Sequence, residues 1–379
     1  MILLIVMLVG AGLLISLPTT WVVLRLSHRA GAFDSAPIEG QVKAASRRIP
    51  NTGGIAIATG VLLPLVSAAI GFGLLDTESL PSVLEPMGAH LPGLKSQLPL
   101  GWTLIGCVLG LHVLGLIDDR RPMGPWLKLV IMLVPGVLFA VFFETRLMTL
   151  LDAHVGGPWL SIIITVLWFT AIINAMNFID NMDGLSGGIT VIAGSMLLIA
   201  TLLNGQWFVA ALCALLVGSV LGFLIYNFPP AKIFMGDGGS LVIGLLLAFL
   251  TVRTTYTPTV ETGTAPSGWY AVLMPLVILA VPLYDFVSVT LIRLSQGKSP
   301  FVGDMQHFSH RMRDRGLGAR STILVIYALT LATGISGLLM TRALPWQAIM
   351  LGVQVLALIG AIALFEYRSP LNQSGTHDG

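Results

Sequence analysis

Acidic and amide side chains interrupt the apolar sequence at three places. The run Asn174-Ala-Met-Asn-Phe-Ile-Asp-Asn-Met-Asp-Gly184 separates two long apolar stretches, and Asp118-Asp119 and Asp237 interrupt others. Ionisable residues at membrane depth are costly and usually functional. Carboxylates gathered within about 5 Å repel by roughly 3 kcal/mol per pair at an effective dielectric of 20, so they need a cation. Carboxylate and amide oxygens suit Mg²⁺, a hard ion that proteins commonly share with substrate phosphates.

The third of these acids lies in a glycine-rich loop. Pro229 and Pro230 end the preceding apolar stretch, and Asp237-Gly-Gly-Ser240 starts the next one. The first turn of a helix presents free backbone N–H groups and a positive dipole end, which suit a phosphate. The plain alternatives are an ordinary turn and aspartates that only cap helices. The number of acids favours a joint site.

A fourth polar segment, residues 301–315, contains two histidines and three arginines. An ordinary basic loop on the inner side of a membrane explains the arginines. It does not explain His307 and His310, whose spacing of three places both on one helical face. With Arg311 they form a group of donors that suits phosphate.

Three isolated polar residues have a structural and a functional interpretation. Lys128 follows Asp118-Asp119 closely and either neutralises a phosphate or extends to lipid headgroups. Asp285 interrupts an apolar stretch and either pairs with Arg293 or reaches the site. His112, within an apolar stretch, is interpreted as a packed polar residue.

Composition places these motifs in a membrane protein. Hydrophobic residues make up 55% of the chain and charged residues 10%, whereas soluble domains have about 25% charged residues. The net charge of +2, with no block of basic residues, argues against nucleic-acid binding. The two cysteines lie in apolar runs and form no disulfide framework or zinc pattern. We expect an all-α integral membrane protein with one polytopic domain over residues 1–367 and a polar tail over 368–379.

Apolar stretches of roughly 20 residues predict about 11 transmembrane helices, with about ten as the alternative because the eighth stretch is short and could be partly re-entrant. The stretches cover residues 2–26, 53–74, 99–117, 126–143, 159–178, 186–203, 207–227, 239–252, 270–294, 321–341 and 346–365. The first is interpreted as a retained helix and not as a signal peptide, since no basic segment precedes it.

The distribution of basic residues between the loops predicts the orientation. With the N-terminus outside, the inner segments hold Arg29, Lys43, Arg47, Arg48, Arg120, Arg121, Lys232, Lys298, Arg311, Arg313, Arg315, Arg320 and Arg368, and the outer loops hold Lys95, Arg146, Arg253 and Arg342. This orientation puts all the acidic motifs and both histidines on the cytoplasmic side. The C-terminus is then cytoplasmic as well.

Taken in order, these motifs resemble those of the polyprenyl-phosphate N-acetylhexosamine-1-phosphate transferases (glycosyltransferase family 4), integral membrane enzymes that start bacterial cell-wall and surface-polysaccharide lipid intermediates. The resemblance covers residues 29–320, nearly the whole catalytic core, and is closer to the undecaprenyl-phosphate GlcNAc-1-phosphate branch than to the phospho-MurNAc-pentapeptide branch. The matching pieces are Gly115-Leu-Ile-Asp-Asp119 with Lys128, Asn174-Ala-Met-Asn-Phe-Ile-Asp180 with Asp183-Gly184, Ala231-Lys-Ile-Phe-Met-Gly-Asp237 with Gly239-Ser240, and His307-Phe-Ser-His310.

The resemblance implies a multi-pass enzyme of the bacterial inner membrane. It would transfer a sugar-1-phosphate from a UDP-N-acetylhexosamine to undecaprenyl phosphate, releasing UMP, with Mg²⁺ as cofactor and Mn²⁺ as the alternative. A homodimer is left open. The expected roles are catalysis by Asp118, Asp119, Asp180 and Asp183, substrate binding by Lys128, Asn174, Lys232, Gly239, His307, His310 and Arg311, and metal binding by Asn177 and Asp237.

The chain departs from the family pattern at three positions. Ser309 replaces a usual histidine, Asn181 replaces a glycine, and Ala45 lies near the place of another histidine. One-step transfer and a two-step route through a phosphorylated aspartate both stay open. The other functional classes considered are a cation-coupled transporter and a non-enzymatic membrane scaffold. The transporter would carry its ionisable residues near the bilayer midplane.

Overall fold

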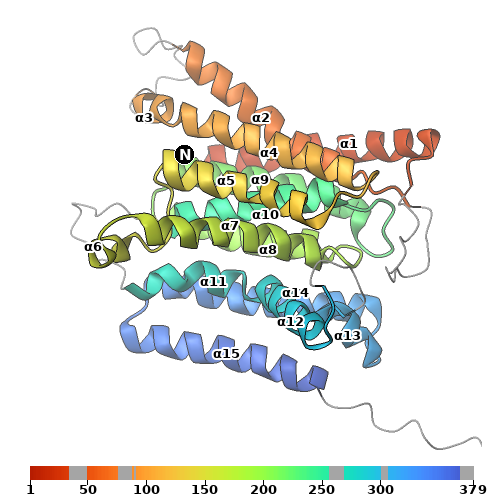
Figure 1. The fold of residues 1–379 in the computed structure, drawn as a ribbon. Coiled ribbons are helices and arrows are strands. Elements are labelled where there is room, and N and C mark those ends of the chain that lie inside the picture. Colours follow the sequence, from red (N-terminus) through yellow and green to blue (C-terminus); the bar gives the residue numbers. More distant parts are fainter. Residues whose placement is uncertain (34–48, 76–87, 89–90, 256–268, 300–305, 368–379) are drawn as a thin grey trace, which may run out of the picture.

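The computed structural model describes residues 1–33, 49–75, 88, 91–255, 269–299 and 306–367. These residues form α-helices and short 3-10 segments, and no strand occurs among them. The helices run side by side across one bundle (Figure 1). The predicted tail and the first-loop residues Lys43, Ala45, Arg47 and Arg48 lie outside the described residues.

Ten helices of the described chain are long and apolar enough to cross a membrane. They are α1 (Ile2–Ala30), α2 (Gly54–Leu74), α4 (Leu98–Asp118), α5 (Pro125–Phe142), α7 (Trp159–Ile179), α8 (Leu185–Leu203), α9 (Trp207–Asn227), α10 (Asp237–Thr255), α14 (Ala319–Met340) and α15 (Pro345–Tyr367). Short elements lie between them: α3 (Leu91–Ser96), η2 (Thr149–Leu151), α6 (Asp152–Val155) and α13 (Phe308–Asp314).

The predicted span over residues 270–294 is divided into η3 (Trp269–Leu273), α11 (Met274–Ile278) and α12 (Ala280–Ser295). Pro282 explains the break, because it has no N–H to donate to the carbonyl group of Ile278, four residues earlier. Figure 1 shows α11 and α12 passing in succession from one end of the bundle to the other. The N-terminus and the end of α15 consequently lie at opposite ends, as an odd number of crossings requires.

The eighth predicted span, residues 239–252, is longer than expected. Helix α10 has 19 residues, begins at Asp237 and continues past Arg253. Of its most apolar stretch of 18 residues, 89% is buried. It lies in the middle of the bundle against α2, α4, α7, α8 and α9 (Figure 1). The alternative of a short re-entrant segment is therefore wrong. Its uniform burial matches a helix that is apolar on every side.

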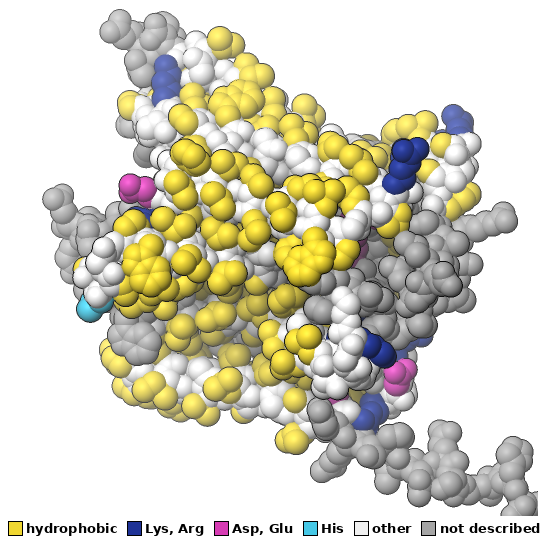
Figure 2. Space-filling view, in the orientation of Figure 1, with side chains coloured by type: hydrophobic (Ala, Val, Ile, Leu, Met, Phe, Trp, Pro, Cys, Tyr) yellow, Lys and Arg dark blue, Asp and Glu magenta, His cyan; other side chains and the backbone are white. Residues whose placement is uncertain are grey.

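The surface has the pattern of a membrane protein. Figure 2 shows hydrophobic side chains covering the middle of the visible face, with Lys, Arg, Asp and Glu near its ends. Large apolar side chains are widely exposed, for example Leu74 at 82% and Leu356 at 72%. Such a belt would be unstable in water and suits lipid. The chain is a multi-pass membrane protein.

Two close backbone contacts hold α10 in place at one end of the bundle. A Cβ atom added to Gly115 of α4 would lie 2.3 Å from the Gly238 nitrogen, and one added to Gly54 of α2 would lie 2.3 Å from the Gly239 nitrogen. Helices approach this closely only through small residues. This end, where α4 and α7 finish and α5, α8 and α10 begin, is called the acidic end below.

Candidate active site

Asp119 joins the first acidic motif to the start of α10. Its carboxylate accepts the backbone N–H groups of Asp237, at 3.2 Å, and Gly238, at 3.4 Å. It thus caps a helix more than 100 residues away in sequence. Burial, together with the nearby charge of Asp237, raises the pKa of Asp119 to about 7, although the two N–H groups favour its ionised form.

Lys128, at the start of α5, lies between two carboxylates. Its ammonium is 2.9 Å from Oδ2 of Asp118 and also contacts Oδ2 of Asp237. The other oxygen of Asp118 accepts the N–H of Met123 at 2.7 Å, which fixes the carboxylate. The side chain of Lys128 is only 16% exposed, so it packs within the acidic end. The alternative that it extends to lipid headgroups is wrong in this structure.

Asn177 brings the second acidic motif to the same place. Its Nδ2 donates to Oδ1 of Asp237 at 2.8 Å and to the hydroxyl of Ser240 at 2.9 Å. Asp237 therefore receives Lys128 on one oxygen and Asn177 on the other. Three predicted motifs, from α4–α5, α7 and α10, meet at this one carboxylate.

Asp180 and Asp183 lie beside this junction, after the end of α7. Burial, followed by the charges of Asp237, Asp119 and Asp183, raises the pKa of Asp180 well above its ordinary value. Asp183 Oδ2 accepts the N–H of Ala231 at 3.0 Å, which ties the second motif to the loop before α10. The acidic end thus brings the five predicted aspartates into one region, where Lys128 contacts two of them, Asp118 and Asp237. Such an arrangement attracts further positive charge.

The turn that follows Asp183 is held from two sides. Gly184 has a φ of +74°, which only glycine adopts freely. Its N–H donates to Oδ1 of Asn227 at 2.9 Å, and its carbonyl accepts the hydroxyl of Tyr327. Asn227 is 3% exposed and also donates to the carbonyl of Ile233 at 2.8 Å. This asparagine therefore connects the second and third motifs.

Both predicted histidines lie on or next to α13, beside the end of α7. Nδ1 of His307 donates to Asp285 at 2.9 Å, and the same carboxylate accepts the N–H of Phe308 at 2.6 Å. The ring of His307 packs edge-on against Phe178, with ring centroids 5.8 Å apart. Burial, then His307, then Arg313 lower the pKa of His310, so its imidazole is neutral at pH 7. Asp285 pairs with His307, and the sequence alternative of pairing with Arg293 is not the arrangement found.

Ser309 and Asn181, two of the three residues expected to depart from the family pattern, contact each other. The Ser309 hydroxyl donates to Oδ1 of Asn181, whose Nδ2 in turn donates to the carbonyl of Phe178 at 2.8 Å. This contact links α13 directly to the second acidic motif. The histidine segment and the acidic end are thus joined through residues that differ from the family pattern.

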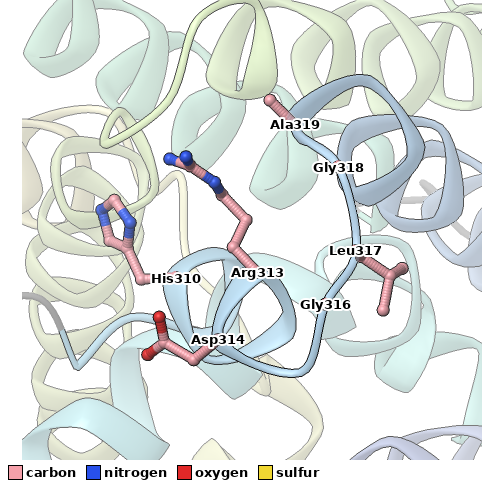
Figure 3. A pocket seen from close by; sticks show the side chains of 7 residues that line it. All are labelled: His310, Arg313, Asp314, Gly316, Leu317, Gly318 and Ala319. Carbon is pink, nitrogen blue, oxygen red and sulfur yellow. The ribbon is translucent and has the colours of Figure 1, made fainter.

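A cavity of about 380 Å³ opens next to His310 (Figure 3). His310, Arg313 and Asp314 of α13 line one part of it, and Arg313 extends between His310 and the loop of residues 316–319. Its arginine and its neutral imidazole can both donate to an anionic ligand.

Four predicted substrate-binding residues have other surroundings. Asn174 donates to Thr170 of its own helix at 2.8 Å and faces Met132. Lys232 is exposed on the loop before α10. The N–H groups of Gly239 and Ser240 donate to Gly236, so the expectation of free donors at this helix start is not met. Arg311 is bound to Glu366 of α15.

The donor set partly fits the predicted metal. Asp237 and Asn177 supply the carboxylate and amide groups that Mg²⁺ prefers, and the surplus of negative charge favours a divalent cation. No three His, Cys, Asp or Glu side chains of the described residues are close enough together to hold a metal ion. The Lys128 ammonium contacts Asp237 where a cation would bind. A metal at Asp237 would therefore lie close to the Lys128 ammonium, and the two positive charges would compete for this carboxylate.

Residues 101–255 match the model of glycosyl transferase family 4. Over this region the chain is similar to glycosyl transferase family 4. A probable undecaprenyl-phosphate N-acetylglucosaminyl 1-phosphate transferase of Bacillus subtilis is 29% identical over 347 residues, covering 90% of this chain and 86% of the relative. A decaprenyl-phosphate N-acetylglucosaminephosphotransferase of Mycobacterium tuberculosis is 29% identical, covering 81% and 76%. An undecaprenyl-phosphate alpha-N-acetylglucosaminyl 1-phosphate transferase of Escherichia coli is 26% identical, covering 73% and 69%.

The family and branch indicated by the motifs are thus confirmed. The matched region spans α4 to α10 and includes the residues that meet at Asp237. Asn227, Tyr327 and Glu366 also hold this site, although the sequence did not indicate them, and the sequence left the role of Asp285 open. A lone acid within an apolar stretch was the signal for Asp285. Asn227 and Tyr327 gave none, because each acts through a backbone group of a distant loop.

Proposed function

We propose that this protein transfers GlcNAc-1-phosphate from UDP-GlcNAc to undecaprenyl phosphate and releases UMP. The product would start a cell-wall or surface-polysaccharide lipid intermediate. The observation that carries the proposal is the Lys128 ammonium held between Asp118 and Asp237 at one end of a membrane bundle, beside α13 and its cavity. The match of residues 101–255 to the model of glycosyl transferase family 4 and the names of the relatives support the same reaction.

The reaction joins an oxygen of the lipid phosphate to the phosphorus that carries the sugar. The bond from that phosphorus to the oxygen of UMP breaks, and UMP leaves with the bonding electrons. Catalysis of this kind consists mainly of positioning and charge neutralisation. A phosphate monoester, with a second pKa near 6, is largely dianionic at pH 7, so it needs little help from a base.

The residues of the acidic end divide these tasks. Asp118 and Asp119 orient the lipid phosphate, and Asp119 accepts any remaining proton. Lys128 leaves its carboxylates to neutralise phosphate oxygens, while His307, His310 and Arg313 donate to the diphosphate of the donor. Asp237 with Asn177 would hold Mg²⁺, which neutralises diphosphate charge when bound; Mn²⁺ is the alternative. Asp180 and Asp183 position the nucleotide.

We propose that the protein lies in the bacterial inner membrane with its acidic end in the cytoplasm and its N-terminus outside. The support is the distribution of basic residues. Among the described residues, those at the acidic end by their place in the helices and loops are Arg29, Arg120, Arg121, Lys128, Lys232, Lys298, Arg311, Arg313, Arg315 and Arg320, and those at the opposite end are Lys95, Arg146, Arg253 and Arg342. A homodimer stays a prediction that light scattering of the detergent-solubilised protein would check.

The test is UMP release by purified protein in detergent with undecaprenyl phosphate and Mg²⁺. We expect release with UDP-GlcNAc that requires both the lipid and the metal, and much less with UDP-MurNAc-pentapeptide. Asp237→Asn, the matched variant that keeps the shape of the side chain, should abolish release. Folded wild-type protein that releases no UMP with UDP-GlcNAc, or an Asp237→Asn variant with the wild-type rate, would contradict the proposal. A transporter would bind substrate without releasing UMP.

A further inference from the structure

Glu366 is a buried carboxylate near the end of α15, the last helix of the described chain. Its side chain is 5% exposed. One oxygen accepts the Tyr284 hydroxyl at 3.0 Å and two groups of Arg311, Nε at 2.9 Å and a terminal nitrogen at 2.7 Å. A glutamate at this depth in a membrane protein is costly unless it is paired, so its position calls for an explanation.

Arg311 directs the rest of its guanidinium to the segments around α13. One terminal nitrogen donates to the Ser288 hydroxyl at 2.9 Å, and the other contacts the carbonyl of Gln306, just before α13. Arg315, one turn later, donates to the backbone carbonyl of Glu366. A planar guanidinium holds several partners in fixed directions. The network therefore joins α12, α13 and α15 rigidly.

Helix α15 has little other attachment at this end. Only 17% of its most apolar stretch of 18 residues is buried. Its buried apolar residues Ala348 and Val355 belong to a separate cluster with Tyr270, Val277 and Met340, nearer the opposite end. Figure 1 shows α15 at the edge of the bundle, with its last turn on the side of α12 and α13. The polar network is thus its main contact with the site region.

The network includes Arg311, the residue next to His310, which is proposed to bind the diphosphate of the UDP-sugar. Arg311 directly follows His310, and α13 has only seven residues. Asp285 holds the first turn of α13 through His307 and Phe308, while Glu366 holds its middle through Arg311. Tyr284 and Asp285 are adjacent on α12, so the two attachments share one support. A helix of this length is not stable alone and needs such contacts to keep its position.

We propose that Glu366 is a positioning residue, which acts through Arg311 to set His307 and His310 against the acidic end. The peripheral helix α15 is therefore part of the transferase machinery through its contact with α13. The role assigned to the two histidines rests on the proposed function. Their placement by Glu366 is a separate statement about the fold and can be measured without substrate.

The experiment compares wild type, Glu366→Ala, Glu366→Gln, Arg311→Ala and the double alanine variant. Glutamine keeps an acceptor for Tyr284 and one arginine nitrogen, so it should restore part of the function. Glu144→Gln, an exposed glutamate at the opposite end, is the control. The readouts are kcat and KM for UDP-GlcNAc, the melting temperature, and the rate at which diethyl pyrocarbonate modifies each histidine. The exposed His154 serves as internal reference.

We expect Glu366→Ala to raise KM about tenfold and to lower kcat less, with at least a threefold faster modification of His307 and His310 relative to His154. Arg311→Ala and the double variant should match it, because the residues act as one unit. Wild-type KM and unchanged histidine reactivity in Glu366→Ala would overturn the proposal. If that variant does not fold, the same result in folded Glu366→Gln and Arg311→Ala overturns it. Absence of UMP release from wild type would refute the proposed function, while the histidine reactivities would still decide the role of Glu366.

Discussion

Replacing Lys128 with methionine removes the ammonium between Asp118 and Asp237 and keeps the length of the side chain. At an effective dielectric of about 20, charges 2.9 Å apart attract by roughly 6 kcal/mol. Desolvation offsets part of this attraction, and removing one partner of a buried pair commonly costs about 3–5 kcal/mol. The site is partly open, with 16% of the Lys128 side chain exposed, so we take the lower value, about 3 kcal/mol, as the interaction energy of the Lys128 ammonium.

If Lys128 gives a phosphate oxygen a comparable stabilisation in the transition state, its removal lowers kcat on the order of 100-fold. The same change should strengthen metal binding, since it removes a charge that competes for Asp237. We expect the Mg²⁺ concentration that gives half of the maximal rise in melting temperature to fall at least about tenfold.

The assays are UMP release at saturating substrates and thermal unfolding in detergent over a Mg²⁺ titration. Lys298→Met, which removes an exposed lysine after α12, is the control and should behave as wild type in both. A Lys128→Met variant with more than half of the wild-type rate would refute the catalytic assignment. An unchanged or weaker response to Mg²⁺ would refute the argument that lysine and metal compete.

Three further predictions concern single contacts. The pKa of Asp119 is raised to about 7, against 3.8 for the free group. Between these pH values the metal-free native state holds a proton that the unfolded state has released, so the free energy of unfolding falls as pH rises through this window. The melting temperature should therefore fall from pH 5 to pH 8, and it should fall less in Asp119→Asn. Asp285→Asn should weaken the hold on His307 and raise KM for the UDP-sugar several-fold, whereas an unchanged KM would show that the contact is dispensable. In a double-mutant cycle on initial rates, Asn181→Ala and Ser309→Ala should be strongly non-additive, and additive losses would show that their hydrogen bond does not couple the two loops.

Most of the architecture could be predicted because it depends on local composition. Long apolar stretches identify spans wherever they occur, and the ten helices agree with the predicted stretches. The errors have local causes as well. Pro282 divides one span, and α10 is longer than expected because Arg253, which suggests a helix end, lies inside its last turn.

The site was predictable in part. The three acidic motifs and the histidine segment do gather at one end of the bundle, as the alternation of spans requires. Their individual partners were not predictable. The arginine expected to bind phosphate is bound to Glu366, and the amides expected to bind phosphate donate to Asp119 and Gly236.

The sequence by itself determined that this is a multi-pass membrane protein, that it is similar to glycosyl transferase family 4, and which polar segments matter. These are properties of short stretches of chain, since a bilayer selects apolar runs and makes every ionisable interruption costly. Only the tertiary structure decided that Lys128 neutralises Asp237, that Asp119 caps α10 and that α15 holds α13. Each of these contacts joins residues that are 55 to 118 positions apart in the sequence, so their geometry comes from helix packing and has no local signal.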